Sequence, residues 1–243
     1  WKPISAREFM DRVYCLALYL ESKGVSAEDS GCIFSPNNPQ WVHTDLAVLL
    51  LNAKSAGIYP NSTSKDAQYI LNHTGAKVFA VKDREFFQKV FGEQGDAAIP
   101  ASVRVLLSFD SDTTFSTRAV SYEAAVAEGR KISEARGRRG LEDFLSKLNP
   151  QEPKILIYTS GTTGNPKGAL LSHQNLTATS DLVSAFWKLP MARGDLFSFL
   201  PLCHIAEKLQ NVGVGISRRF AVNFCTKFDN VAVELPEVQP SLL

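Results

Sequence analysis

The sequence has few of the residues that mark metal centres and disulfide frameworks. Its 243 residues include four cysteines and four histidines, and no two cysteines form a Cys-x-x-Cys pair. This spacing argues against a zinc or iron–sulfur site and favours reduced, buried thiols. The 26 basic and 25 acidic side chains leave a net charge of only +1. Because no overall field attracts nucleic acid, we expect no nucleic-acid partner.

Long hydrophobic runs and repeats are also absent. No window reaches the ~18 consecutive apolar residues of a membrane span, and the most apolar stretch, 46–51, has polar neighbours. We therefore expect an intracellular protein, either cytoplasmic or peripherally bound to a membrane. The chain begins at Trp1 rather than Met, so this sequence does not decide how the protein is targeted. Nothing in the composition indicates an oligomeric state.

Short apolar runs alternate with amphipathic segments along most of the chain. Strands are predicted at 31–34, 58–60, 77–81, 103–107, 155–158, 169–171, 197–200 and 221–224. Helices are predicted at 6–23, 39–56, 65–74, 84–91, 122–127, 141–148, 173–187 and 231–235. This alternation predicts an α/β protein whose parallel-rich sheets are covered by helices.

The pattern is less regular between residues 110 and 150, where basic side chains cluster. They are Arg130, Lys131, Arg136, Arg138 and Arg139. A phosphate- or nucleic-acid-binding patch and a solvated loop both account for such a cluster. No aromatic residues are interleaved with the charges, as stacking on single strands requires, so a solvated loop is favoured.

One segment carries a chemical signal. Residues Thr159–Gly168, after a buried-strand pattern, contain three glycines, four hydroxyls and Lys167. Glycines let the backbone approach a ligand, and N–H, hydroxyl and ammonium groups bind phosphate. A polar surface turn has a similar composition but does not require four hydroxyls and a lysine. A Walker loop needs Gly before and Ser or Thr after its lysine, where this chain has Pro166 and Gly168.

The order of residues from Tyr158 to Gly168 resembles the nucleotide-binding signature of adenylate-forming enzymes. This superfamily contains acyl-CoA synthetases, luciferases and peptide-synthetase adenylation domains. Other segments resemble the long-chain fatty acyl-CoA synthetases: Ser35–Trp41, Ala56–Pro60, Tyr69–Ala76, Leu171–Asn175 and Leu200–Glu207. The resemblance covers most of the chain except about 110–150. It implies the incomplete N-terminal part of the large domain: a first α/β lobe at about 1–109, an irregular connector at 110–150 and a phosphate-loop lobe at 151–243.

The resemblance also implies a reaction. A fatty acid and ATP would form an acyl-adenylate, whose acyl group would then pass to CoA. The implied ATP-binding residues are Thr159, Ser160, Gly161, Thr162, Thr163, Gly164 and Lys167, with Thr163 and Lys167 as catalytic residues. Thr159 is the implied ligand of Mg²⁺, which accompanies ATP.

The histidines differ in what they imply. By resemblance, His204 lines the acyl pocket, although a buried, hydrogen-bonded core histidine is an equally good interpretation. Glu207 is either its partner or a solvated charge. His173 is expected to be structural, and His43 and His73 receive no role.

Several parts of the family pattern are not found in the sequence. They are the downstream acidic Mg²⁺ ligand, the ribose-binding aspartate and the C-terminal lid domain with its catalytic lysine. We therefore expect the first part of a larger enzyme, inactive as a synthetase on its own. Three alternatives stay open: another acid–CoA ligase such as an aryl-CoA ligase, an amino-acid adenylation domain, and a non-catalytic nucleotide-binding remnant.

Overall fold

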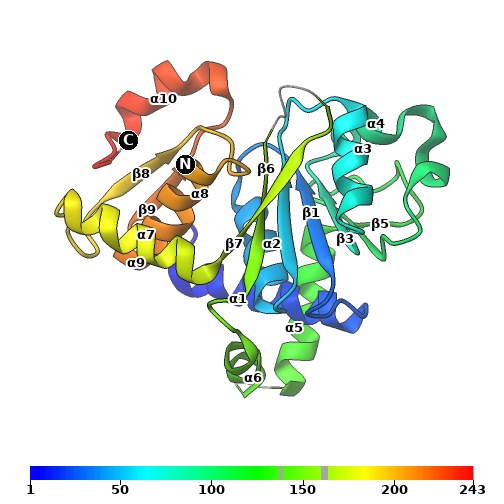
Figure 1. Cartoon of the computed structure of the whole chain (residues 1–243), viewed down its shortest axis with the longest axis horizontal. Helices are drawn as coiled ribbons and strands as arrows, with labels where there is room; N and C mark the ends of the chain where they lie inside the picture. Colours follow the sequence, from blue (N-terminus) through cyan, green and yellow to red (C-terminus); the bar gives the residue numbers. More distant parts are fainter. Residues whose placement is uncertain (137–138, 160–163, 243) are drawn as a thin grey trace.

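A seven-stranded sheet organises the chain. A computed structural model describes residues 1–136, 139–159 and 164–242. The strands of the sheet are β1 (Ser30–Phe34), β2 (Lys54–Ile58), β3 (Val78–Val81), β4 (Val105–Ser108), β5 (Ala119–Ser121), β6 (Pro153–Thr159) and β7 (Lys167–Ser172). Their order is β5-β4-β3-β1-β2-β6-β7, and every pair is parallel except β6 with β7 (Figure 1). The predicted fold class is confirmed.

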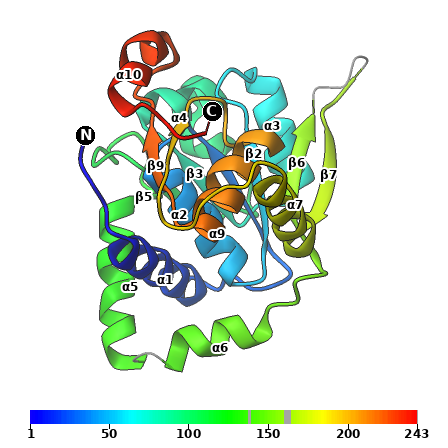
Figure 2. The ribbon, with the colours of Figure 1, turned by 90° about the vertical axis from the view of Figure 1, so that its left-hand side faces the viewer.

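Helices cover both faces of this sheet. The first group is α1 (Ala6–Ser22), α2 (Pro39–Leu50), α3 (Ser64–His73), α4 (Arg84–Phe91), α5 (Tyr122–Arg136) and α6 (Arg139–Lys147), with a 3-10 segment η1 (Gly92–Ala98) after α4. α1, α2 and α5 pack on one face, where α1 and α5 contact each other (Figure 2), and α3 and α4 pack on the other.

A smaller unit follows β7. It contains α7 (His173–Phe186), β8 (Asp195–Ser198), α8 (Ile205–Lys208), the π-helical segment η2 (Leu209–Val214), α9 (Gly215–Arg218), β9 (Ala221–Phe224), η3 (Phe228–Asn230) and α10 (Val231–Val238). β8 and β9 pair in parallel, and Leu242 bridges to Leu196 on β8.

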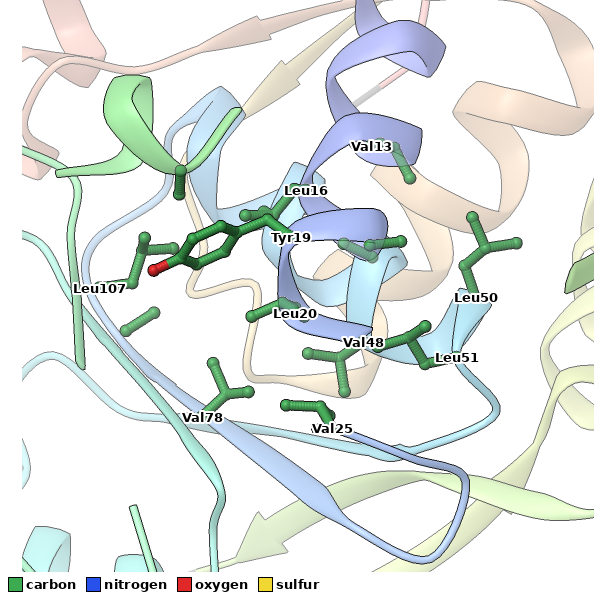
Figure 3. Close-up of a cluster of buried hydrophobic side chains, with 14 of the residues drawn as sticks. Val13, Leu16, Tyr19, Leu20, Val25, Val48, Leu50, Leu51, Val78 and Leu107 are labelled. Atoms are coloured by element: carbon green, nitrogen blue, oxygen red, sulfur yellow. The ribbon is translucent and has the colours of Figure 1, made fainter. Parts of the chain in front are cut away.

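Alternating side chains of the strands supply two cores. On β3, Val78 and Ala80 face α1, α2 and α5, whereas Phe79 and Val81 face α3 and α4. Successive side chains of a strand point to opposite faces, so a strand covered on both sides reads as a continuous apolar run. Figure 3 shows part of the first core, where Val78 meets side chains of α1 and α2.

Local capping explains where several helices begin. Ser5 accepts from the Glu8 N–H at the start of α1, and Asn38 accepts from Trp41 at the start of α2. Ser172 and Asn175 form a complete capping box at α7. Each cap supplies an acceptor for an N–H that has no partner within the helix. These starts were predicted correctly.

The second predicted helix was extended too far. It ends at Leu50, and Asn52, with a φ of 57°, turns the chain back. Gly57, the first residue after the predicted helix at 39–56, instead lies within β2. A Cβ on Gly57 would lie 2.5 Å from the Cβ of Cys203, so the glycine is required by packing.

The predicted solvated loop of basic residues was wrong where the structure describes it. Arg130, Lys131 and Arg136 lie on α5, which is much longer than expected because it packs along α1. Arg130 pairs with Asp11 of α1 at 2.6 Å, and Arg136 pairs with Glu21 at 2.5 Å. Arg138 lies outside the described residues.

Three further expectations concern the cysteines, membrane-spanning helices and the division of the chain. All four cysteines are unpaired and buried, as predicted. Among the residues that the structure describes, no helix combines the length and apolarity needed to cross a bilayer. The division at 109 and 150 stays a prediction, although β6 and β7 belong to the same sheet as β1–β5.

Candidate functional site

The predicted phosphate-binding segment joins two strands at one edge of the sheet. β6 runs parallel to β2 and ends at Thr159, so the segment leaves from the carboxyl end of the parallel strands. β7 returns antiparallel from Lys167, which lies opposite Thr159 in the register. In open α/β sheets, ligands bind outside the carboxyl ends of the strands.

The described ends of this hairpin are open to solvent. Gly164 and Lys167 are exposed, and Gly164 has a φ of 119°, where glycine is favoured. Thr159 is also exposed, and its hydroxyl lies 3.5 Å from the Lys167 carbonyl oxygen. Four further predicted residues lie outside the described residues: Ser160, Gly161, Thr162 and Thr163.

A second segment packs against the strand that leads into this hairpin. Ile205, at the start of α8, packs against a buried cluster formed by Leu49 of α2 and Ile155 and Ile157 of β6. The fold thus brings the residue after His204 next to the hairpin that carries Thr159 and Lys167. The two regions are far apart in the sequence, and packing alone joins them.

The approach of this second segment depends on a missing side chain. In β2, Gly57 lies beside Ile157 of β6, and Cys203 packs directly over it. Burial raises the pKa of the Cys203 thiol to about 12, so it is an inert packing group rather than a nucleophile.

His204 itself is exposed. It caps α8, with its Nδ1 accepting from the Ala206 N–H at 3.2 Å. The interpretation as a buried core histidine is therefore wrong, because the side chain is used at a solvent-facing helix end. Its predicted place in an acyl pocket stays a prediction.

Glu207 differs from both expectations. It is only 1% exposed, so it is not a solvated charge. Its carboxylate accepts from the Ser198 hydroxyl at 2.8 Å and from the Asn37 amide at 3.4 Å, and within the described structure no hydrogen bond joins it to His204. Burial raises the pKa of Glu207 to about 7. No local pattern indicates this cluster, because Asn37 lies 161 positions before Ser198 and 170 before Glu207.

A buried ion pair anchors α8 to α2. The Lys208 ammonium lies 2.7 Å from the Asp45 carboxylate, and the two residues are 2% and 0% exposed. Asp45 also accepts from the Ser55 hydroxyl at 2.6 Å. His173, the first residue of α7, is half-buried, and burial lowers its pKa, which fits its expected structural role.

Tyr158, the last buried residue before the hairpin, has a structural partner. Its hydroxyl lies 2.7 Å from Nδ1 of His73 on α3. Burial raises the pKa of Tyr158, so the phenol stays protonated. Both residues line a cavity of about 220 Å³ between α3 and the sheet.

A larger cavity lies between α7 and the segment that follows His204. Its volume is about 480 Å³. The lining residues are mostly apolar: Val183, Trp187, Leu189, Ala206, Leu209, Gln210, Val214, Ser241 and Leu242. His204 is not in its lining, although Ala206 is.

The described residues of the hairpin suit a nucleotide phosphate with its Mg²⁺. Lys167 offers an exposed ammonium, and open space surrounds the position of a Cβ on Gly164. Within ranges 1–136, 139–159 and 164–242, no group of three or more His, Cys, Asp or Glu side chains could hold a metal. A Mg²⁺ here would take one protein hydroxyl, from Thr159, and complete its coordination with phosphate and water, as this ion commonly does.

Comparison with known proteins places the chain. The family profile described as AMP-binding enzyme matches residues 1–239. The chain belongs to the AMP-binding enzyme family. Its solved structural neighbours include the anthranilate CoA ligase AuaEII in complex with anthranoyl-AMP, with a TM-score of 0.76 at 18% identity, covering 97% of this chain and 43% of that one.

The AMP-binding relatives of known activity are much longer than this chain. The human long-chain-fatty-acid–CoA ligase ACSBG2 is 25% identical over 216 residues, 89% of this chain and 32% of its own length. The long-chain-fatty-acid–CoA ligase FadD15 of Mycobacterium tuberculosis is 28% identical over 244 residues, 100% of this chain and 38% of its own length. This chain thus spans about a third of these relatives.

Proposed function

We propose that this chain is the nucleotide-binding N-terminal part of an ATP-dependent ligase that joins a long-chain fatty acid to CoA. The observation that carries the proposal is the meeting of two segments at one sheet edge. The β6–β7 hairpin bears Thr159 and Lys167, and Ile205 packs the His204 segment against a cluster that includes Ile155 and Ile157 of β6. The long-chain ligases among the relatives favour a fatty acid as the substrate.

The chemistry fits an adenylation. A fatty carboxylate oxygen attacks the α-phosphorus of ATP, and the bond to the bridging oxygen breaks to release pyrophosphate. Positioning and charge neutralisation provide most of the catalysis in such transfers. Lys167 would neutralise the departing phosphates, and Thr159 with the hairpin hydroxyls would bind their oxygens. The thiol of CoA would then attack the acyl carbon and displace AMP.

Titration of MgATP into the 243-residue chain tests the nucleotide part. Lys167→Ala should weaken binding about ten-fold or more, because an ammonium–phosphate contact is lost. Lys147→Ala, an exposed lysine on α6, is the matched control and should bind as the unmodified chain does. Equal affinity for the Lys167→Ala and unmodified chains would overturn the proposal.

Adenylate formation by the full-length gene product tests which class of carboxylic acid is the substrate. We expect pyrophosphate exchange with palmitate and little with benzoate or amino acids. Preference for benzoate would indicate an aryl-CoA ligase, and preference for an amino acid would indicate an adenylation domain. Nucleotide binding without exchange for any acid would indicate a non-catalytic remnant.

We also propose peripheral membrane association through the end of α7, at the left-hand tip of Figure 1. Leu182, Phe186 and Trp187 are 71%, 79% and 61% exposed there. Lys188 and Arg193 follow and form no ion pair with the described residues. Aromatic and cationic side chains together favour an anionic bilayer surface. Co-sedimentation with phosphatidylserine vesicles should fall for Phe186→Ser/Trp187→Ser, and unchanged co-sedimentation would refute the proposal.

A further inference from the structure

A buried hydrogen-bonded network lies behind the His204 segment. Asn37, in the loop after β1, donates from its amide nitrogen to the Leu200 carbonyl oxygen at 2.6 Å. Its amide oxygen accepts from the Leu202 N–H at 2.9 Å. One side chain thus fixes main-chain groups on both sides of Pro201, three residues before His204.

The network continues into α8. The Asn37 amide also donates to the Ser198 hydroxyl at 2.8 Å, and that hydroxyl donates to the Glu207 carboxylate at 2.8 Å. Ser198 is fully buried at the end of β8. Three elements therefore meet at Glu207: the loop after β1, β8 and α8. Such a network selects one backbone arrangement, because any other leaves buried polar groups unpaired.

We propose that Asn37, Ser198 and Glu207 are positioning residues that hold the segment 200–204 in one place, so that His204 meets the acid substrate in a fixed position. This inference rests on the proposed function, which makes the His204 segment part of the acid site. None of the three side chains needs to touch the substrate. Their effect passes through Leu200 and Leu202, whose main-chain groups they bind.

The carboxylate makes the network sensitive to pH. Burial raises the pKa of Glu207 to about 7, and its hydrogen bonds to Ser198 and Asn211 only partly oppose this. The ionised carboxylate accepts stronger hydrogen bonds than the neutral acid. The raised pKa nevertheless means that burial disfavours the ionised form overall, so the segment is held most firmly while Glu207 is neutral, and its hold weakens as the pH rises through 7.

No ionic partner contacts this carboxylate within the described part of the chain. The other titratable groups on α8 and the elements around it are His204 and Lys208 on α8, Asp45 on α2, His173 on α7 and Asp195 on β8. Lys208 pairs with Asp45, and Asp195 accepts from Asn223. Glu207 is thus held by hydrogen bonds to uncharged side chains rather than by a salt bridge.

The amide resonance of Leu202 reports the network without any catalysis. In the 243-residue chain we expect its chemical shift to change with an inflection near pH 7. Glu207→Gln keeps the shape and an acceptor for Ser198 but should abolish the inflection. Glu234→Gln, a buried carboxylate hydrogen-bonded to Thr226, is the matched control and should retain it. An inflection unchanged in Glu207→Gln, or absent from the unmodified chain, overturns the inference.

Kinetics of the full-length gene product provide the second readout. Ser198→Ala should raise KM for the fatty acid about five- to ten-fold at every pH, with KM for ATP nearly unchanged. Glu207→Gln should give a KM for the acid that no longer depends on pH and matches the unmodified enzyme below pH 6. Equal changes in both KM values, or none, would reduce the network to a purely structural role.

Failure of the proposed function would look different. In that case the unmodified protein adenylates no fatty acid, while the Leu202 resonance still shows whether the network responds to Glu207. If instead the enzyme is active, loses activity in Lys167→Ala and keeps its acid KM in Ser198→Ala and Glu207→Gln, the proposed function stands and the positioning inference falls.

Discussion

The buried pair of Asp45 and Lys208 offers a sharp test of how the smaller unit is attached to the sheet. The pair joins α2 to α8 at 2.7 Å with both side chains almost fully buried. One Asp45 oxygen receives both the ammonium and the Ser55 hydroxyl, and the other has no partner among the described residues. The Lys208 ammonium also lies 5.5 Å from the Trp41 ring centroid.

Lys208→Met removes the cation and keeps most of the side-chain volume. The remaining Asp45 carboxylate is then buried with a single hydroxyl donor. We expect a loss of about 3–5 kcal/mol in the free energy of unfolding, the usual cost of leaving one member of a buried pair uncompensated. The double variant Asp45→Leu/Lys208→Met should recover most of this loss, because no buried charge is left.

Urea unfolding followed by circular dichroism measures these differences. The control is Lys23→Met, which breaks the half-exposed pair with Glu128 and should lose less than about 1 kcal/mol. If Lys208→Met lowers the free energy of unfolding no more than Lys23→Met does, the Asp45 carboxylate must be solvated or relocated, and the reasoning fails. A double variant less stable than Lys208→Met would show that the loss does not come from a buried, unpaired Asp45 carboxylate.

Three further predictions follow. Gly57→Ala should cost about 1–3 kcal/mol in urea unfolding and displace the Cys203 segment, since the new Cβ would meet Cys203; an unchanged unfolding midpoint would contradict this. Burial lowers the pKa of His43 to about 3, so its contribution to stability is complete above pH 6.5 and is lost as the pH falls toward 3. The His43→Gln variant should therefore lose less stability than the unmodified chain between pH 7.5 and 4.5. Parallel losses in the two chains would contradict this. The 243-residue chain alone should form no thioester from ATP, palmitate and CoA, and detected product would show that this expectation is wrong.

Much of the fold could be predicted because its signals are local. Ser5 and Ser172 cap helices whose first turns follow them directly in the sequence. The continuous apolar run of β3 indicates two buried faces without any knowledge of which helices cover them. The hairpin was recognisable for the same reason, since Thr159–Gly168 is one continuous stretch.

The failures have a common cause in contacts distant along the chain. Gly57 directly follows the helix predicted at 39–56, and only Cys203, 146 positions later, explains why a glycine is required there within a strand. Arg130 looked like part of a solvated loop until α1 supplied Asp11 as its partner. Neither local pattern contains the information that decides its structure.

By itself the sequence determined the α/β class and most element positions, because hydrogen-bond caps and side-chain periodicity act within a few residues, and it singled out Thr159–Gly168 as a candidate phosphate-binding segment. Only the tertiary structure decided that the His204 segment packs against strand β6, and that Glu207 is buried on Asn37 and Ser198 rather than solvated. Burial and partner choice depend on which distant surfaces meet, and these set the pKa of Glu207.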